Sequence, residues 1–308
     1  MKHKYLVALF FILICLTGFT QKQKVWLDTD TGNEMDDLYA IVRLMKDSLV
    51  DVKGISSAHF NNADLLVFEK WNGYYTKDLN TVGESQRLNE LILKTLNLSA
   101  IPHPVGADRQ IGRARGQQDA RASPASAAII NTVRKLSPGE KLDILTLGAL
   151  TNIATAVILA PEIVPQIRCF SLGAKYNVKT KVWDKSEFNI RNDLNAFDYL
   201  LNLEGFDFTI MPLQTAFPLQ FNRDQTYNRL HENIPIEKIL GNRWKEQNPQ
   251  DTVRVMWDLA LVEAYLQPGF SKMAIVKTPP ENKKRKIKVF TAINREELYG
   301  DFWKILKQ

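Results

Sequence analysis

Short apolar runs that alternate with helical stretches place the strongest limit on how this 308-residue chain folds. Runs of strand character cover residues 50–57, 141–147, 167–172 and 206–211. Helical spacing lies between them, around residues 65–71 and at residues 151–159, whereas residues 108–123 have no convincing period and are interpreted as a loop at the mouth of a site. Strands that are separated by helices pair in parallel through right-handed crossovers. We therefore predict an α/β fold with an open, mostly parallel, Rossmann-like sheet and helices on both faces.

The start of the chain has the character of a secretory signal peptide. A basic stretch at residues 2–4 precedes an apolar run at residues 5–19, and the small residue Thr20 comes before a polar one. The run is too short to span a bilayer comfortably as a helix. We expect cleavage after residue 20, export to the periplasm or the extracellular space, and no stable membrane anchor. Residues 21–308 are expected to form one domain.

Charge and cysteine content bear on partners and redox state. The formal net charge of +6 includes two lysines within residues 1–20, and no basic stripe is interleaved with aromatic residues. We therefore expect no nucleic-acid partner and interpret the basic run at residues 283–286 as a solvated edge. Cys169 is the one cysteine left after the expected cleavage, so we expect no intramolecular disulfide and a buried thiol.

Acidic residues gather where the first apolar run turns into a helix. Asp28 and Asp30 end the run, Asp36 and Asp37 open the helix, and Glu34 lies between them. Carboxylates this close repel one another unless a cation lies among them, and their oxygens suit Ca²⁺ or Mg²⁺. Helix capping by acidic residues explains the second pair but not the first. The stretch therefore predicts a metal site.

This stretch resembles the signature of the calcium-dependent nucleoside hydrolases, in which Asp-x-Asp-x-Gly precedes Asp-Asp at a strand-to-helix turn. The resemblance implies that family's fold and four ligands for Ca²⁺: the side chains of Asp30, Asp37 and Asp258 and the backbone carbonyl of Leu147. It also implies that Asp30 is the general base and that Asp36 binds the ribose hydroxyls. Residues 33–35 stand where the family usually has a single residue, so Glu34 is a further candidate ligand.

Three later blocks carry the same resemblance. Residues 145–152 are similar to the family's Gly-x-Leu-Thr-Asn block, although a tight turn with Thr151 as a helix cap explains them as well. Glu187 and Asn189 match a ribose-binding Glu-Phe-Asn block, and in an extended segment their side chains would point the same way. An ordinary polar loop before a helix capped by Asp193 is the alternative.

The last block surrounds Asp258, which lies in an apolar helical stretch at residues 255–260. A lone carboxylate there is costly unless it is paired or coordinated, and a solvent-facing Asp is the alternative. Trp257 stands where the family frequently has a His that protonates the leaving purine. An indole does not donate that proton, but it can stack on a base.

Three further residues complete the predicted substrate site. Asn61 matches a sugar-contacting Asn of the family, with the register left open by the neighbouring Asn62. Leu172 falls where the family often has a Met beside the sugar. His231, in a helical stretch one turn after Tyr227, is a candidate for the base pocket, and a surface histidine is the alternative.

Together these features favour an exported hydrolase that splits a ribonucleoside or another small riboside into base and ribose, using a Ca²⁺-bound water and Asp30. The alternative is a calcium-dependent nucleoside- or sugar-binding protein whose catalysis is lost or altered. A surface protein that uses the ion for stability is a third reading. The sequence leaves open the base preference, the leaving-group acid and whether the chain forms a homo-oligomer.

Overall fold

A computed structural model describes residues 22–61, 76, 78–114 and 117–308. The expected signal peptide and the helical stretch expected around residues 65–71 lie outside these residues. In the described part, no helix is both long enough and apolar enough to cross a membrane.

A seven-stranded sheet forms the centre of the molecule, with the order β12-β13-β9-β6-β5-β1-β2. Its strands are β1 (Gln23–Thr29), β2 (Val50–Ser57), β5 (Leu142–Thr146), β6 (Ile167–Leu172), β9 (Asp207–Met211), β12 (Ser271–Lys277) and β13 (Lys286–Ile293). All neighbours pair in parallel except β12 and β13, which pair antiparallel at one edge. The predicted mostly parallel sheet is confirmed.

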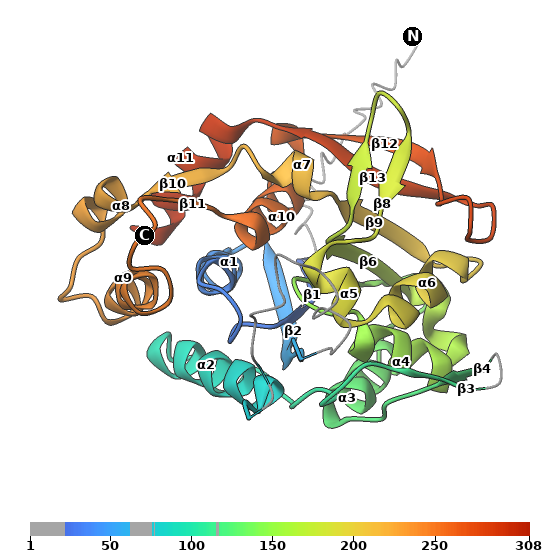
Figure 1. Cartoon of the computed structure of the whole chain (residues 1–308). Helices are drawn as coiled ribbons and strands as arrows, with labels where there is room; N and C mark the ends of the chain where they lie inside the picture. Colours follow the sequence, from blue (N-terminus) through green and yellow to red (C-terminus); the bar gives the residue numbers. More distant parts are fainter. Residues whose placement is uncertain (1–21, 62–75, 77, 115–116) are drawn as a thin grey trace, which may run out of the picture.

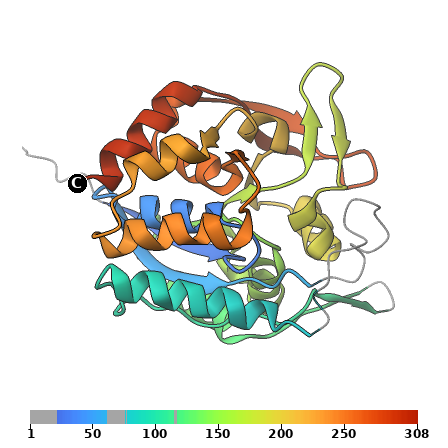
Figure 2. The same ribbon diagram turned by 60° about the vertical axis from the view of Figure 1, so that its left-hand side comes forward.

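Helices cover both faces of this sheet, and Figures 1 and 2 show the two layers from different sides. One apolar core contains residues of α1 (Asp36–Met45), α2 (Thr81–Thr95), α9 (Pro235–Gln247), α10 (Trp257–Leu266) and α11 (Arg295–Leu306). The other contains residues of α3 (Pro124–Arg134), α4 (Thr151–Leu159) and α6 (Leu194–Asn202). The helix pair α1 and α10 packs together, which brings distant parts of the chain into contact.

Strand β1 shows why the apolar runs are continuous. Val25 and Leu27 lie in one core, and Trp26 between them lies in the other. Successive side chains of a strand point to opposite faces, so a strand covered on both sides is apolar throughout. The indole of Trp26 donates to the hydroxyl of Ser56 on β2 at 2.9 Å, which satisfies its polar atom inside the core. Cys169 on β6 is buried, as expected.

Smaller elements lie outside the main sheet. Three two-stranded hairpins or ladders are β3 (Gly112–Ala114) with β4 (Gln117–Asp119), β7 (Lys175–Asn177) with β8 (Val182–Asp184), and β10 (Gln220–Asn222) with β11 (Val253–Val255). Short helices are α5 (Phe188–Asn192), α7 (Leu213–Ala216), α8 (Arg223–Arg229), η3 (Pro161–Gln166) and η4 (Pro268–Phe270). Residues 108–123, which we expected to form an irregular loop, therefore include the β3–β4 hairpin.

Candidate active site

A pocket of about 240 Å³ opens at the carboxyl ends of the central strands. Asp30 follows β1, Leu147 follows β5, and Leu172 ends β6. This is the edge at which open parallel sheets bind ligands. The lining residues are Asp30, Asn33, Glu34, Asp36, Leu147, Leu172, Glu187, Phe188, Asn189, Leu213, Trp257 and Asp258.

Three carboxylates form the tightest acidic cluster that the described residues contain. Asp36 and Asp37 begin α1, Asp258 lies in the first turn of α10, and each offers an oxygen within 4.8 Å of the others. The backbone N–H of Asp258 donates to Asp36 at 3.1 Å, so the packing of two helix starts creates the cluster. All three side chains are buried.

Several carboxylate oxygens in this cluster and beside it lack a protein partner. Within the described part of the chain, Oδ1 of Asp36, Oδ1 of Asp258 and Oδ2 of Asp30 are buried without a hydrogen bond. A buried, unpartnered carboxylate oxygen is costly unless a cation or proton satisfies it. Hard oxygen donors of this kind fit a divalent ion such as Ca²⁺ or Mg²⁺. The residues present therefore fit the metal that the sequence predicted.

The pKa values of the three clustered carboxyls are raised because the groups are buried close together. Burial, reinforced by the charge of Asp37, raises the pKa of Asp36 to about 6. Burial also raises the pKa of Asp37 to about 7, and that of Asp258 well above its ordinary value, where the charge of Asp37 adds to the effect. A cation that binds here therefore competes with protons for carboxyls whose proton affinity is raised.

Asp30 lies in the same pocket but outside the tightest cluster, which instead contains Asp36, the residue we expected to bind ribose. Burial raises the pKa of Asp30 well above its ordinary value, and the charge of Asp37 raises it further. Gly148 packs against this carboxylate so closely that an added Cβ would lie 2.8 Å from its Cγ. The carbonyl of Leu147, the predicted backbone ligand, accepts from Nδ2 of Asn189 at 2.5 Å.

The lengthened acidic turn is held by arginines from the second half of the chain. Nη2 of Arg243 on α9 donates to the carbonyl of Gly32 at 2.9 Å. Nη2 of Arg254 on β11 lies 2.5 Å from Oε2 of Glu34. Glu34 therefore lines the pocket as half of an ion pair and is not part of the tight carboxylate cluster.

The predicted sugar-binding pair is present, although its local structure differs from the expectation. Glu187 and Asn189 both line the pocket. They do not lie in an extended segment, because Glu187 is the N-cap of α5 and accepts from the backbone N–H groups of Asn189 and Ile190 at 3.0 and 3.1 Å. Asp193 caps α6 by accepting from the backbone of Ala196, as the alternative reading expected.

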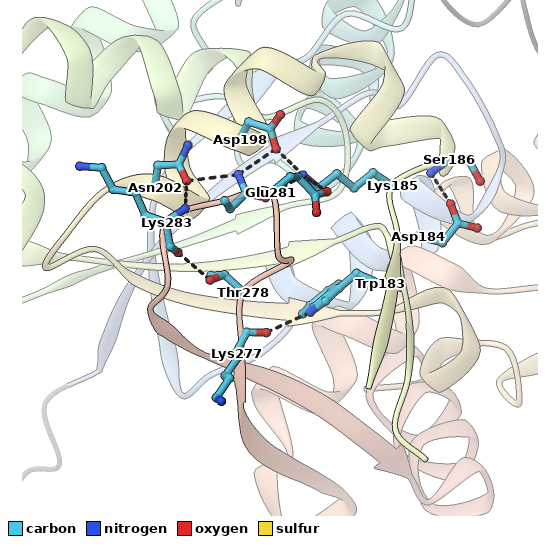
Figure 3. Close-up of polar contacts among 11 residues, drawn as sticks. Trp183, Asp184, Lys185, Ser186, Asp198, Asn202, Lys277, Thr278, Glu281 and Lys283 are labelled. Atoms are coloured by element: carbon cyan, nitrogen blue, oxygen red, sulfur yellow. Dashed lines mark hydrogen bonds and ion pairs between the residues drawn. The ribbon is translucent and has the colours of Figure 1, made fainter. Parts of the chain in front are cut away.

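A polar latch anchors the segment that leads into Glu187 (Figure 3). Nζ of Lys185, just after β8, lies 2.6 Å from Asp198 on α6 and 2.7 Å from Glu281 in the β12–β13 connection. Nε1 of Trp183 donates to the carbonyl of Lys277 at 3.0 Å. These contacts tie the β7–β8 hairpin to two neighbouring elements, and Glu187, the N-cap of α5, follows Lys185 by two residues.

Two predicted contact residues do not line the pocket that the described residues form. Asn61 donates from Nδ2 to the carbonyl of Asp108 at 3.0 Å, and its neighbour Asn62 lies outside the described residues. His231 follows α8, whereas we expected it inside a helix, and its backbone N–H donates to Glu237 at 2.7 Å. Leu172 lies in the lining as predicted.

Trp257 lines the pocket as the first residue of α10. Its ring centroid lies 5.9 Å from that of Phe217, with a tilt of 45°. Asn33 lines the pocket, and Arg254 contacts the lining residue Glu34 from outside it; neither was predicted from the sequence. The one sequence feature that could have indicated them is the lengthened turn at residues 33–35, because its extra side chains need partners elsewhere in the fold.

Comparison with known proteins agrees with this architecture. A family model described as inosine-uridine preferring nucleoside hydrolase matches residues 25–300. A plant nucleoside hydrolase has a TM-score of 0.68 at 17% identity, covering 92% of this chain and 98% of that one. An inosine-uridine preferring nucleoside hydrolase from Bacillus anthracis has a TM-score of 0.66 at 16% identity, covering 92% and 99%. At these identities the likeness shows the fold.

A curated relative is matched over a shorter stretch. An uncharacterized protein of Schizosaccharomyces pombe is 33% identical over 92 residues. The match covers 30% of this chain and 29% of that protein, so it spans less than a third of either.

Proposed function

Because the chain belongs to the family of inosine-uridine preferring nucleoside hydrolases, we propose that it hydrolyses the N-glycosidic bond of a ribonucleoside to base and ribose. The observation that carries this proposal is the convergence of Asp30 with the cluster of Asp36, Asp37 and Asp258 in one sugar-sized pocket. The family match over residues 25–300 makes hydrolysis the function to test first.

The metal that fits the acidic cluster is proposed to be Ca²⁺. Asp36, Asp37 and Asp258 would hold it, with Asp30 and the carbonyl of Leu147 on the pocket wall beside them. Ca²⁺ would make a bound water a better nucleophile and bind sugar hydroxyls. Because oxygen ligands suit both Ca²⁺ and Mg²⁺, the same assay should compare the two ions.

The residues of the chain have separate parts in the proposed reaction. Glu187 and Asn189 orient the ribose, and Asp30 accepts the proton of the water that attacks the anomeric carbon. As the glycosidic bond breaks, positive charge develops on the sugar, and the surrounding carboxylates stabilise it. Trp257 stacks on the base at the pocket wall.

Export is a separate part of the proposal. The basic residues 2–4 and the apolar run at residues 5–19 support a signal peptide ending at residue 20, followed by one domain over residues 21–308. N-terminal sequencing of the protein recovered outside the cytoplasm would give residue 21 as the first residue. Recovery with residue 1 intact would contradict it.

Release of ribose tests the enzymatic proposal. The Ca²⁺-loaded protein is incubated with a panel of purine, pyrimidine and other ribosides, and reducing sugar is measured over time. We expect hydrolysis of at least one riboside, lost on chelation and restored by Ca²⁺. If no member of the panel releases ribose, the proposal is contradicted.

A binding protein without catalysis is the second candidate function. The observation that favours it is Trp257 in the lining where a proton donor is expected. Calorimetry with inosine and with ribose tests it. Tight binding of inosine together with no ribose release would support this second function over the first.

A further inference from the structure

A groove of about 340 Å³ crosses the amino-terminal edge of the central sheet, opposite the candidate active site. Its lining includes Gln23 at the start of β1 and Arg168 near the start of β6, which place it at this edge. Most of the lining is apolar, with Phe170 on β6, Tyr265 on α10 and Met273 on β12. The ring centroids of Phe170 and Tyr265 lie 5.0 Å apart. We call this cavity the amino-edge groove.

The groove continues onto a part of the sheet that the helices leave uncovered. Phe170 pairs with Thr209 on β9, which pairs with Lys288 on β13. Lys288 in turn pairs with Ile275 on β12, which lies at one edge of the molecule (Figure 1). Paired residues of neighbouring strands point to the same face, so Ile275 shares the face of the groove. Ile275 is 70% exposed and Met273 is 49% exposed.

Lysines surround these exposed apolar residues. Residues 271–288 contain six lysines and one acidic residue, Glu281. Lys277 and Lys286 are both exposed and lie directly opposite each other across β12 and β13, where like charges repel. A lysine on an edge strand deters unwanted strand pairing, which explains Lys277 but not Lys286 on the inner strand. An anionic partner would remove the repulsion.

A second group of cations borders the groove. A neighbouring cavity shares Gln23 and Arg168 with it and is also lined by Lys22, Lys24 and Lys141. Carboxylates balance Lys24 and Arg168, whereas Lys22 and Lys141 add to the positive charge of this face. Lysines therefore border the apolar surface at the starts of β1 and β5 as well as on β12 and β13.

The expected signal peptide leads into this same face. Its apolar run ends at residue 19, and β1 begins at Gln23, which lines the groove. Residues 20–22 span about 10 Å when extended. A chain whose residues 5–19 are held in a membrane therefore presents the amino-edge groove to that membrane.

We propose that this face docks reversibly on the surface of an anionic lipid membrane, with Met273 and Ile275 contacting the lipid chains and the lysines contacting the phosphate headgroups. An exposed apolar patch bordered by lysines is typical of proteins that lie at a membrane interface. Each lysine near an anionic surface increases the affinity about fivefold. The candidate active site lies at the opposite edge of the sheet and stays open to solvent, so this inference does not depend on the proposed function.

Binding to lipid vesicles tests the proposal. The protein recovered outside the cytoplasm is mixed with vesicles of phosphatidylcholine or of phosphatidylglycerol, and the bound fraction is measured by flotation. At low salt we expect at least about tenfold tighter binding to the anionic vesicles, and the difference should shrink as added salt screens the charges. Equal binding to the two kinds of vesicle would overturn the proposal.

Substitution of two lysines assigns the binding to this face. Lys277→Gln combined with Lys286→Gln should weaken binding to phosphatidylglycerol vesicles about twentyfold. The urea midpoint should stay the same or rise, because the two facing charges are removed, and this separates lost binding from unfolding. Lys238→Gln combined with Lys245→Gln removes the same net charge from exposed positions on α9 and should keep an affinity close to that of the wild type. Equal weakening in both double variants would contradict the proposal.

Ile275→Ser tests the apolar part of the surface. Because the side chain is exposed, the fold should be retained, while binding to phosphatidylglycerol vesicles should weaken about fivefold. Ile234→Ser, at an exposed position just before α9, is the matched control and should bind as the wild type does. Sedimentation velocity without vesicles tests a second copy of the chain as the occupant. If the wild type forms a dimer that Ile275→Ser dissociates, this face is an interface between two copies and the proposal is overturned.

Discussion

Asp30 is the residue on which the proposed reaction depends. Its side chain is buried with an exposed fraction of 2%, and its Oδ2 has no hydrogen-bond partner among the described residues. Asp30→Asn preserves the shape beside Gly148 but removes the base, so we expect a folded, Ca²⁺-binding protein whose turnover falls about 10²–10⁴-fold. Steady-state ribose release and a Ca²⁺ titration measure this. Retained turnover would reject Asp30 as the base.

Glu263 on α10 gives a pH prediction that is independent of the active site. Its Oε1 lies 2.8 Å from Nε of Arg43, and its Oε2 has no partner within the described chain. Burial raises the pKa of Glu263 from its usual 4.5 to about 8, although the charge of Arg43 opposes this shift. A carboxyl whose folded pKa is raised stabilises the fold most when protonated. Its contribution is complete below pH 4.5 and is lost as the pH rises through 8.

Glu263→Gln should remove this pH dependence, because the amide stays neutral and its oxygen can still accept from Arg43. The urea midpoint of the wild type is expected to fall relative to the variant between pH 5 and 8. Denaturation curves at several pH values, followed by circular dichroism, measure the difference. If the difference in urea midpoint between wild type and variant is the same at every pH, the pKa of Glu263 is not raised by folding and the prediction is wrong.

The pocket residues whose place the sequence predicted correctly are those at the ends of apolar runs. Asp30, Leu147 and Leu172 each follow or end a strand of the central sheet, so the apolar runs alone place them at one edge. His231 was wrongly placed in a helix because nothing in the local sequence marks Arg229 as the last residue of α8. Arg254 was missed because its role depends on a contact with Glu34 across 220 residues.

At the scale of elements, the latch around Lys185 links the β7–β8 hairpin to substrate binding. Lys185→Met keeps the aliphatic stem but leaves Asp198 and Asn282 without their contacts to Nζ. We expect the free energy of unfolding to fall by about 1–2 kcal/mol. The KM for a riboside should rise, because Glu187 follows two residues later, while Ca²⁺ affinity should not change.

Lys179→Met, at an exposed position in the turn of the same hairpin, is the matched control for this substitution. It should leave both stability and KM at wild-type values. If Lys185→Met and Lys179→Met behave alike, the latch does not position the sugar-binding segment.

The elements that the sequence predicted best have a continuous apolar run or a clear helical period. Residues 50–57, 151–159 and 167–172 have the predicted boundaries as β2, α4 and β6. The edge strand β12 was missed, because its side chains are mostly exposed and its pairing with β13 is antiparallel. The hairpins β3–β4 and β7–β8 have three residues in each strand, which is too short for a hydrophobic period to register.

At the scale of the whole molecule, the acidic cluster joins the start of the described chain to its last third. Asp36 and Asp258 are separated by 222 positions and meet where α1 packs on α10. An ion bound there is bound only by the folded chain, so its binding free energy adds to stability. At one hundred times the dissociation constant, Ca²⁺ should stabilise the fold by about 2.7 kcal/mol. Urea denaturation with and without Ca²⁺ measures this, and coincident curves would contradict it.

Calcium binding is also the most direct test of the central claim, which is that carboxylates from distant parts of the chain hold one divalent ion at the pocket. Ca²⁺ is titrated calorimetrically into chelator-stripped wild type and into Asp258→Ala. The account predicts one ion per wild-type chain and an affinity that is weaker by about a hundredfold or more in the variant. No binding by the wild type, or equal affinity in both proteins, would contradict it.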